Sequence, residues 1–559
     1  MKAIKDTITY LNKHKGLYIV IVPAFILTLL PFIFDGQTSC VNNICGFIVG
    51  TNYRDGIWFQ AVAATAFKTF PFQMPNYAGE ALRGYHYLPN LFAYILSFLG
   101  IPITFTYYKL VPIVYMLLIT VVSVQLGKKI QNHPLFVGIF LFFTYFGMHL
   151  SLITSLYHFG EVRNQVLINT FQATRILESP HTAIALIILF SIILLLYQKK
   201  LSMKFRFLIS FFVFLSFGIK FYVACSIIAI LFFYELFQLI KTKNMRFFIF
   251  NNLIYAVGVL LAIFLFYDPM GNSNSGSVFV FSPFATVHHL IESPDMFYLP
   301  QMILARYYLY EHGWSPRLIL IELFSSFLFV LFYFGTRIVG LIQIVVQIAK
   351  RKFNEVELAI TCSIVISIAC SLLFIQKGDW FNPIQFAVPA AFLSNIFAAK
   401  LLYSLLQKSK ILGIAILFLI IIITFPANLS NLFYLSNPGR FVIPQEEMDA
   451  LNFLKKQPNG VVFAPIDEND MAYVSAFTGK PTYVNFVSVL ENAGINFEKR
   501  LSIIDNEPMK IVNSQLVDYI YIPIIHKKSE QFNTMCENTN KYITNFKNKS
   551  AIVCIKNTK

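Results

Sequence analysis

The sequence is poor in charged residues, and acidic residues are the scarcer of the charged kinds. Asp, Glu, Lys and Arg make up 13% of the 559 residues, whereas hydrophobic residues make up 57%. Soluble domains are about 45–50% apolar, so this composition excludes an ordinary soluble protein. Stretches such as Ala183–Tyr197 and Ile411–Phe425 hold no charge at all. The chain is therefore predicted to be a polytopic α-helical membrane protein, because a segment in lipid must satisfy its backbone hydrogen bonds internally.

The shortage of acid leaves a net charge of +16, a property that nucleic-acid-binding proteins often have. Its distribution argues against such a partner, because residues 437–559 hold nearly as many acidic as basic residues. The excess lies in the apolar part, in short clusters between apolar stretches, as expected of loops on the cytoplasmic side of a membrane. We therefore expect contacts with membrane lipids and none with nucleic acid. The clusters are Lys2/Lys5/Lys13/Lys15, Lys199/Lys200/Lys204/Arg206, Lys241/Lys243/Arg246, Lys350/Arg351/Lys352 and Lys408/Lys410.

These clusters predict a topology in the plasma (inner) membrane. Apolar stretches, each needing about 20 residues to cross, divide residues 1–436 into about a dozen transmembrane helices. The longest external loops are 35–87 and 268–317. From about residue 437 the composition changes, and helix-like segments such as Gln445–Lys456 alternate with strand-like ones. This pattern predicts a small α/β domain over 437–559, which the charge rule places outside the cytoplasm.

Two stretches do not fit a simple series of straight spans. Between residues 88 and 181 the count of crossings conflicts with the basic clusters, and the favoured solution splits Leu135–Tyr157 at Gly147. Leu318–Ala349 is too long for one straight span and is expected to tilt or to extend into the cytoplasm.

Cysteine is scarce, with seven residues. Three lie in apolar stretches and are interpreted as packing residues. The other four fall in segments that the charge rule places outside, where disulfides can form. For each external pair, a disulfide and two free thiols are both open. The apolar cysteines are Cys225, Cys362 and Cys370, and the external pairs are Cys40/Cys45 and Cys536/Cys554.

The first external loop holds the most informative polar residues. Asp55 precedes Gly56–Phe70, whose apolar spacing predicts an amphipathic helix lying in the membrane interface. Arg83, Tyr85 and His86 form a basic and aromatic cluster further along the loop. A carboxylate can act as a general base, and arginine binds phosphate through paired hydrogen bonds. Asp55 as a helix cap and the cluster as an aromatic belt remain open.

Further candidates lie at the predicted external ends of other spans. Glu161 and Asp268 are alternative acids, and Trp380 is a candidate for stacking on a sugar or a prenyl chain. Lys220 and Arg317 are candidate phosphate ligands, although Lys220 taken alone is better explained as a side chain that reaches the headgroups. His288, His289 and Glu292 resemble a metal cluster, but a solvated loop is the favoured interpretation.

Taken together, the motifs resemble the GT-C superfamily of integral membrane glycosyltransferases, in particular the protein mannosyltransferase and aminoarabinose transferase type and uncharacterised bacterial members. The resemblance covers nearly the whole chain and is closer in architecture than in substrate. It rests on an acid in the first external loop, on residues at three later span ends, and on the C-terminal domain. The motifs are Arg54–Trp58 with Phe70–Pro71, Pro75–Gly79 and Gly84–Tyr87, then Glu178–His181, Gly218–Tyr222 and Gly378–Phe386.

The resemblance implies transfer of a sugar from a polyprenyl-phosphate-linked donor to an acceptor on the external face, usually with inversion. It implies that Asp55 acts at the acceptor or holds a divalent metal such as Mg or Mn. The acceptor is a lipid, a glycan or a protein. A protein acceptor is the least favoured, because Gly56 replaces the second acid of the mannosyltransferase motif and residues 437–559 lack tryptophan. A transporter of lipid-linked saccharides and a non-catalytic membrane assembly protein are the rival interpretations.

Overall fold

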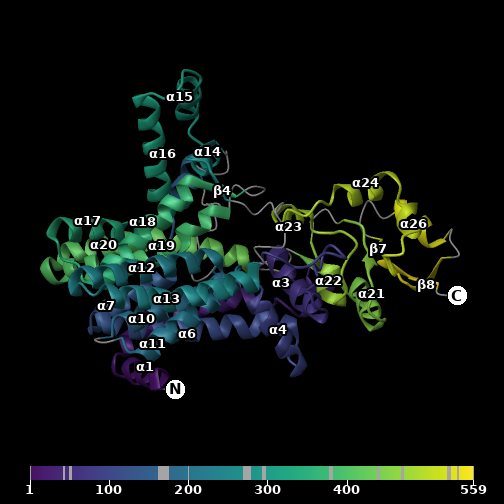
Figure 1. Ribbon diagram of the computed structural model, residues 1–559, viewed down its shortest axis with the longest axis horizontal. Helices are drawn as coiled ribbons and strands as arrows, with labels where there is room; N and C mark the ends of the chain where they lie inside the picture. The colour runs from purple at the N-terminus through teal and green to yellow at the C-terminus, as the bar shows by residue number, and fades with distance from the viewer. Residues whose placement is uncertain are drawn as a thin grey trace. The chain divides into compact units, whose positions relative to one another are not determined.

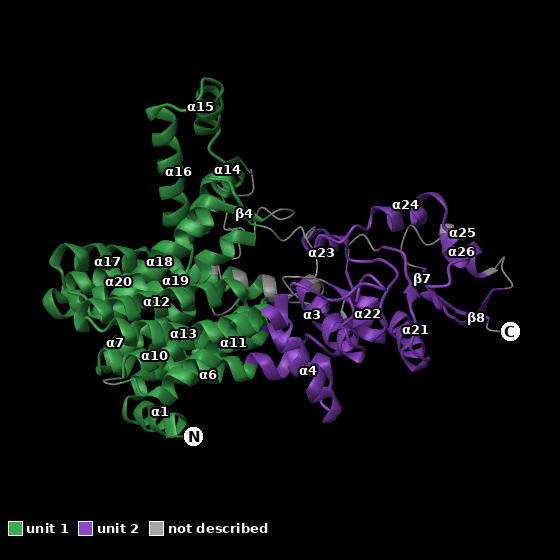
Figure 2. Cartoon of the chain, in the orientation of Figure 1, with its two compact units in different colours: residues 1–30, 113–263, 278–434 green, residues 31–112, 264–277, 435–559 purple. Residues whose placement is uncertain are grey.

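The computed structural model divides into two compact units, each assembled from segments far apart in the sequence (Figure 2). Unit 1 comprises residues 1–30, 113–263 and 278–434, and unit 2 comprises residues 31–112, 264–277 and 435–559. The structure describes residues 2–41, 44–49, 53–160, 176–198, 201–267, 279–292, 298–376, 382–436, 441–466, 471–524, 530–537 and 541–557.

Unit 1 is a bundle of apolar helices (Figure 1). Its basic clusters lie at helix ends, as in α6, which ends with Lys128 and Lys129, and in α12, which has Lys241 in its last turn. The helices are α1 (Lys2–Lys13), α2 (Tyr18–Leu29), α6 (Val111–Ile130), α7 (Pro134–Phe146), α8 (Ser151–Phe159), α10 (Pro180–Leu196), α11 (Met203–Ile219), α12 (Phe221–Thr242), α13 (Met245–Ala262), α14 (Ala285–Glu292), α15 (Pro300–Glu311), α16 (Pro316–Phe334), α17 (Ile338–Lys350), α18 (Glu355–Leu373), α19 (Ala387–Lys408) and α20 (Lys410–Leu435). A short ladder pairs β3 (Phe279–Phe281) with β4 (Phe374–Gln376).

The predicted polytopic helical fold is confirmed. Among the described residues, eight helical segments are long and apolar enough to cross a membrane. Three shorter apolar helices add to them: α4 (Leu88–Phe98), α7 and α10. The predicted split of Leu135–Tyr157 is also confirmed, because α7 ends at Phe146 and α8 begins at Ser151.

The long stretch after Pro316 is not one straight span, as its length predicts. The predicted tilt or extension into the cytoplasm stays a prediction. The stretch breaks at Gly335 into α16 and α17. Gly335 has φ +54°, and a Cβ there would lie 1.9 Å from the carbonyl oxygen of Met148, so only glycine fits. The break is held against the gap between α7 and α8 by a hydrogen bond from the Thr336 N–H to the same oxygen, at 2.7 Å.

Unit 2 contains the predicted C-terminal α/β fold. Its sheet has the order β6-β7-β9-β8, with β6 and β7 parallel and the other pairs antiparallel. α21 has the bounds that the sequence predicts, and β8 was not anticipated. The elements are β5 (Val442–Pro444), α21 (Gln445–Lys456), β6 (Val462–Phe463), α22 (Tyr473–Thr478), α23 (Val487–Asn492), α24 (Glu498–Asn506), α25 (Met509–Val512), β7 (Tyr519–Pro523), α26 (Glu530–Glu537), β8 (Tyr542–Lys547) and β9 (Ala551–Lys556).

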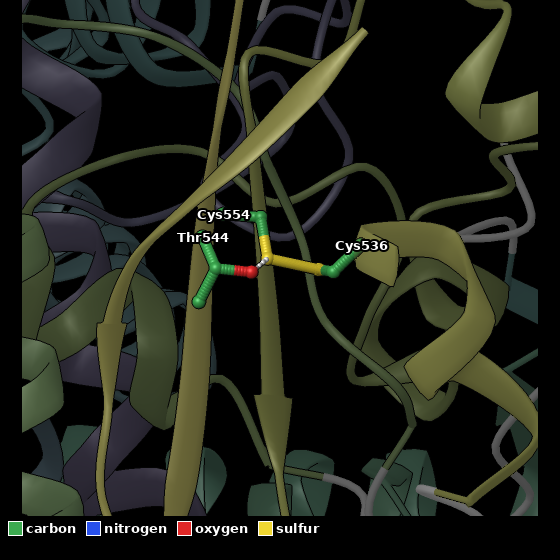
Figure 3. The surroundings of a disulfide bond; sticks show 3 residues. All are labelled: Cys536, Thr544 and Cys554. Atoms are coloured by element: carbon green, nitrogen blue, oxygen red, sulfur yellow. Dashed lines mark hydrogen bonds between the residues drawn. A yellow bond between two sulfur atoms is a disulfide. The ribbon is translucent and has the colours of Figure 1, made fainter. Parts of the chain in front are cut away.

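Both external cysteine pairs form disulfides. Cys536 on α26 bonds to Cys554 on β9, beside the hydroxyl of Thr544 on β8 (Figure 3). Cys40 and Cys45 join β1 (Thr38–Val41) to β2 (Ile44–Ile48), and β2 also pairs with β5.

The first external loop folds as part of unit 2, and its helix α3 (Tyr53–Thr65) is not the amphipathic interfacial helix that its spacing predicts. The ring of Phe59 is 6% exposed, and Gln60, Ala61 and Val62 are at most 1% exposed. α3 is covered by α4 and by α22 from the C-terminal region, and the Thr65 hydroxyl donates to the carbonyl of Ser475. After the loop and α4, unit 2 also includes the short helix α5 (Ile103–Phe105).

Candidate active site

Asp55 occupies a distinctive position on α3. It lies in the first turn of the helix and is exposed, whereas Ile57 and Trp58, just after it, are 0% and 4% exposed. Because helix amide dipoles concentrate positive potential at the N-terminus, this turn stabilises a carboxylate. The side chain therefore lies inside the helix rather than before it, and the helix presents this acid to its surroundings.

Aromatic side chains surround this acid. The ring of Tyr85 packs edge-on against Trp58 at 5.9 Å and stacks on His86 at 4.8 Å. Burial, and then the negative charge of Asp55, raise the pKa of Tyr85 well above its ordinary value. The hydroxyl of Tyr85 therefore keeps its proton and can act as a hydrogen-bond donor at physiological pH.

The structure thus brings together three of the predicted residues, Asp55, Tyr85 and His86. Arg83 precedes them by a few residues in the same loop and is exposed. An arginine with a free path to solvent can reach an anionic ligand.

The C-terminal part of unit 2 holds this loop in place. Asn76 donates to the carbonyls of Asn485 and Phe486 at 2.9 and 3.0 Å. The backbone N–H groups of Ala78 and Thr482 add bonds to the carbonyls of Thr482 and Pro75. Phe486 also packs against Trp58 at 5.9 Å, so the domain contacts the ring that supports Tyr85.

Unit 1 gathers the other three motifs into a second polar cluster. Lys220 lies in extended backbone between α11 and α12 and is 9% exposed. The predicted headgroup-facing role was therefore wrong. His181, at the start of α10 and 0% exposed, lies close enough to interact with its charge. Lys220 also approaches the ring of Tyr222 at 5.7 Å.

A chain of hydrogen bonds continues from this lysine. The Tyr222 hydroxyl and the Asn382 amide both donate to the side-chain oxygen of Gln376, at 3.4 and 2.9 Å. Gln385 donates to Asn382 at 2.8 Å. Residues from the motifs around His181, Lys220 and Gln385 thus converge, although roughly 40 and 160 residues of chain separate them.

The remaining candidates are not part of either cluster. Arg317 is exposed in the first turn of α16, and no described contact joins it to Lys220. Glu161, Asp268 and Trp380 lie outside the described residues. The roles of all these residues, and the combination of Arg83 and His86 with Lys220 and Arg317, stay predictions.

The second external loop is not a solvated loop where it is described. His288, on α14, pairs with Glu322 of α16 at 2.7 Å, and Glu292 pairs with Arg306 of α15. The interpretation as a solvated loop was therefore wrong for His288 and Glu292, because their partners come from helices that composition alone did not predict. His289 is exposed, as that interpretation expects.

Sequence analysis also missed functional candidates. Asp35 is a second acid in unit 2 and is 2% exposed. Tyr222, Gln376 and Asn382 stood within or beside quoted motifs, but a lone tyrosine or amide carries no distinguishing signal. Only the pairing of their segments reveals them.

No family model matches the sequence, and no curated protein matches it. Solved structures do resemble it. The oligosaccharyltransferase of Archaeoglobus fulgidus in the apo form aligns with a TM-score of 0.53 at 13% identity, covering 91% of this chain and 69% of that one. Its complex with Zn and sulfate aligns at 0.50 and 13%, covering 90% and 68%. ArnT from Cupriavidus metallidurans covers 97% and 98% at 9% identity, with a TM-score of 0.48, too low to support an argument. The chain therefore shares the fold of the Archaeoglobus fulgidus oligosaccharyltransferase, as the resemblance of its motifs leads us to expect.

Proposed function

We propose that this chain is a membrane glycosyltransferase that moves a sugar from a polyprenyl-phosphate-linked donor to an acceptor on the external face of the plasma membrane. The fold shared with the archaeal oligosaccharyltransferase supports the class of reaction. The observation that carries the proposal is the exposed carboxylate of Asp55, fixed at the start of a helix that is otherwise buried.

In the proposed reaction, Asp55 takes the proton of the acceptor hydroxyl as its oxygen attacks the anomeric carbon. The bond from that carbon to the phosphate oxygen breaks, and the polyprenyl phosphate leaves with the electron pair. Direct displacement inverts the configuration. Arg83 and His86 lie in the same loop as Asp55, and positive charge there would stabilise the negative charge on the leaving phosphate. The predicted roles of Lys220 and Arg317 as further phosphate ligands stay predictions.

Tyr85 has a different part in this proposal. Its hydroxyl stays protonated beside Asp55, so it donates a hydrogen bond to the carboxylate or to the sugar and cannot itself serve as the base. Its ring offers a face for the sugar, as does Trp380 in the prediction.

A divalent metal has no ligand set among the described residues. The oligosaccharyltransferase structure cited above contains Zn, but no three His, Cys, Asp or Glu side chains gather in the described part of this chain. Asp55 is followed by Gly56 rather than by a second acid. No step of the proposed reaction therefore uses a metal.

The test compares Asp55→Asn with the wild type in transfer from defined polyprenyl-phosphate sugars in detergent. Asparagine keeps the size and most of the helix-start hydrogen bonding but loses the basicity. We expect unchanged thermal stability and a rate about 10²–10⁴-fold lower. A stable variant with near-normal turnover would remove Asp55 from the reaction. Absence of transfer by the wild type from every donor, with binding of polyprenyl phosphate retained, would favour the transporter.

A further inference from the structure

The helices α15 and α16 form a hairpin that has apolar side chains outside and ionisable ones inside, the reverse of a soluble structure. α15 and α16 stand together away from the bundle, with α14 at their base (Figure 1). α16 runs across the direction of the bundle helices rather than along it. α16 belongs to the 35-residue segment Pro316–Lys350, which is long and apolar enough to cross a membrane, yet α17 does not continue it in a straight line.

The ionisable side chains at the base and in the middle of the hairpin face inward and pair with one another. Glu322 is 2% exposed, and its two carboxylate oxygens lie 2.8 and 2.7 Å from the Nε2 atom of His288. Arg306, 5% exposed, pairs with Glu292, and its guanidinium lies 4.6 Å from the ring centre of Tyr307. In water, such residues would be expected at the surface and the apolar ones inside.

The outward face is apolar and aromatic instead. Its exposed fractions are those of helices that cross the membrane: Phe418 and Ile422 of α20, for example, are 62% and 50% exposed. The exposed residues Glu311, His312 and Arg317 lie at the tip of the hairpin, from the end of α15 to the first turn of α16. The outward residues are Leu304 at 70%, Tyr307 at 51%, Tyr308 at 65%, Tyr310 at 62%, Trp314 at 68%, Leu320 at 68%, Leu323 at 56%, Phe324 at 51% and Phe327 at 57%.

The depth of the hairpin follows from α17. Its 13 residues lead from the basic cluster Lys350–Lys352 to the break at Gly335, a distance of about 20 Å at 1.5 Å per residue. The hydrocarbon core is about 30 Å thick, so a cytoplasmic cluster at Lys350 puts the base of α16 in the opposite leaflet. Tyrosine and tryptophan are enriched at the level of the headgroups, where α15 would then lie.

We propose that α15 and α16 form an in-plane hairpin embedded in the outer leaflet, with lipid acyl chains as the occupant of its outward face. Paired internal charges allow this, because ionisable groups at membrane depth persist when they face protein and one another. The proposal is independent of the reaction proposed above. It replaces the interpretation of α15 as part of an aqueous loop and that of α16 as part of a membrane-crossing span.

Trp314 provides the probe, since the chain has three tryptophans. A Trp58→Phe, Trp380→Phe variant of the full chain leaves Trp314 as the only one. It is reconstituted in phosphatidylcholine vesicles brominated near the headgroup or near the chain end, and quenching is compared with that by aqueous acrylamide. We expect loss of most of the Trp314 fluorescence in the lipid brominated near the headgroup, and a smaller loss with acrylamide.

The matched control keeps Trp58 alone, through Trp314→Phe and Trp380→Phe. Trp58 is 4% exposed and should be protected from both quenchers, which also reports that the fold is intact. Stronger quenching of Trp314 by acrylamide than by lipid would overturn the proposal in favour of an aqueous loop. Protection of Trp314 from both quenchers would overturn it in favour of a protein neighbour, such as a second copy.

Discussion

Arg500 joins the loop of the candidate active site to the C-terminal part of unit 2. Its guanidinium donates to the carbonyl of Tyr483 at 2.5 Å and to that of Ala78 at 2.9 Å. It also lies 3.7 Å from the ring centre of Tyr77 and 4.8 Å from that of Tyr483. Arg500→Ala removes all four contacts at once while leaving the backbone of α24 unchanged.

The size of the effect can be worked from these contacts. Hydrogen bonds from charged donors contribute about 1.5–3 kcal/mol each, and a partly exposed cation–π contact adds about 0.5–1 kcal/mol. Arg500 is only half-buried, so the lower values apply. We expect Arg500→Ala to lower the free energy of unfolding of unit 2 by about 2–4 kcal/mol. For a unit of this size the midpoint would fall by roughly 5–10 °C.

Thermal unfolding in detergent, followed by the fluorescence of Trp58 in the Trp314→Phe, Trp380→Phe background, measures this locally, because Trp58 touches Phe486. Lys499→Ala is the matched control, since Lys499 is the exposed neighbour on the same helix. Arg500→Lys should be intermediate, as lysine keeps the charge but not the planar fork. Equal midpoints for the two alanine variants would refute the argument that this guanidinium holds the loop.

Three further predictions concern unit 2. Burial, and then the charge of Lys68, lower the pKa of Lys480 from 10.5 to about 8. Between these pH values the unfolded chain binds more protons, so the unit should gain stability as pH rises. Lys480→Met should flatten that gain in thermal unfolding, and a flat wild-type profile would contradict it. Replacing Cys536 and Cys554 by serine opens a loop with a sequence separation of 18 and should cost about 3 kcal/mol in denaturant unfolding; an unchanged midpoint would count against this. A cysteine at Lys499 should react with an impermeant maleimide on intact cells, and labelling only after permeabilisation would reverse the proposed topology.

Local features of unit 1 could be predicted because they depend on nearby residues. The break at Lys220 and the split at Gly147 stand out as polar or glycine interruptions of apolar runs, and α11 and α7 end beside them. The break at Gly335 could not be predicted in this way, because its cause is not a nearby residue. Arg337 follows it in an apolar run, and the carbonyl of Met148 that excludes any Cβ comes from a segment far earlier in the chain.

The covering of α3 could not be predicted from its own residues. Apolar positions at helical spacing look the same whether they meet lipid or protein, and Trp58, Phe59 and Phe67 fit both. α3 meets protein rather than lipid because α22 packs on it, and the carbonyl of Ser475 on α22 accepts a hydrogen bond from Thr65 across a separation of 410 residues. Pairing at that distance leaves no trace in either segment alone. Likewise, the polar composition of this segment does not show that Glu292 pairs with Arg306.

This long-range assembly changes the role assigned to the C-terminal region. Composition separates it from the membrane part near residue 437, and such a domain is easily taken for an appendage. In the structure it shares one compact unit with residues 31–112, and Asn76, held by the carbonyls of Asn485 and Phe486, lies in the same loop as Tyr85. Removing the partner of a buried amide of this kind lowers the free energy of unfolding by about 1–3 kcal/mol. The support of the candidate acid Asp55 is therefore built from both ends of the chain, and selection on the proposed reaction would act on the C-terminal region as strongly as on the first loop.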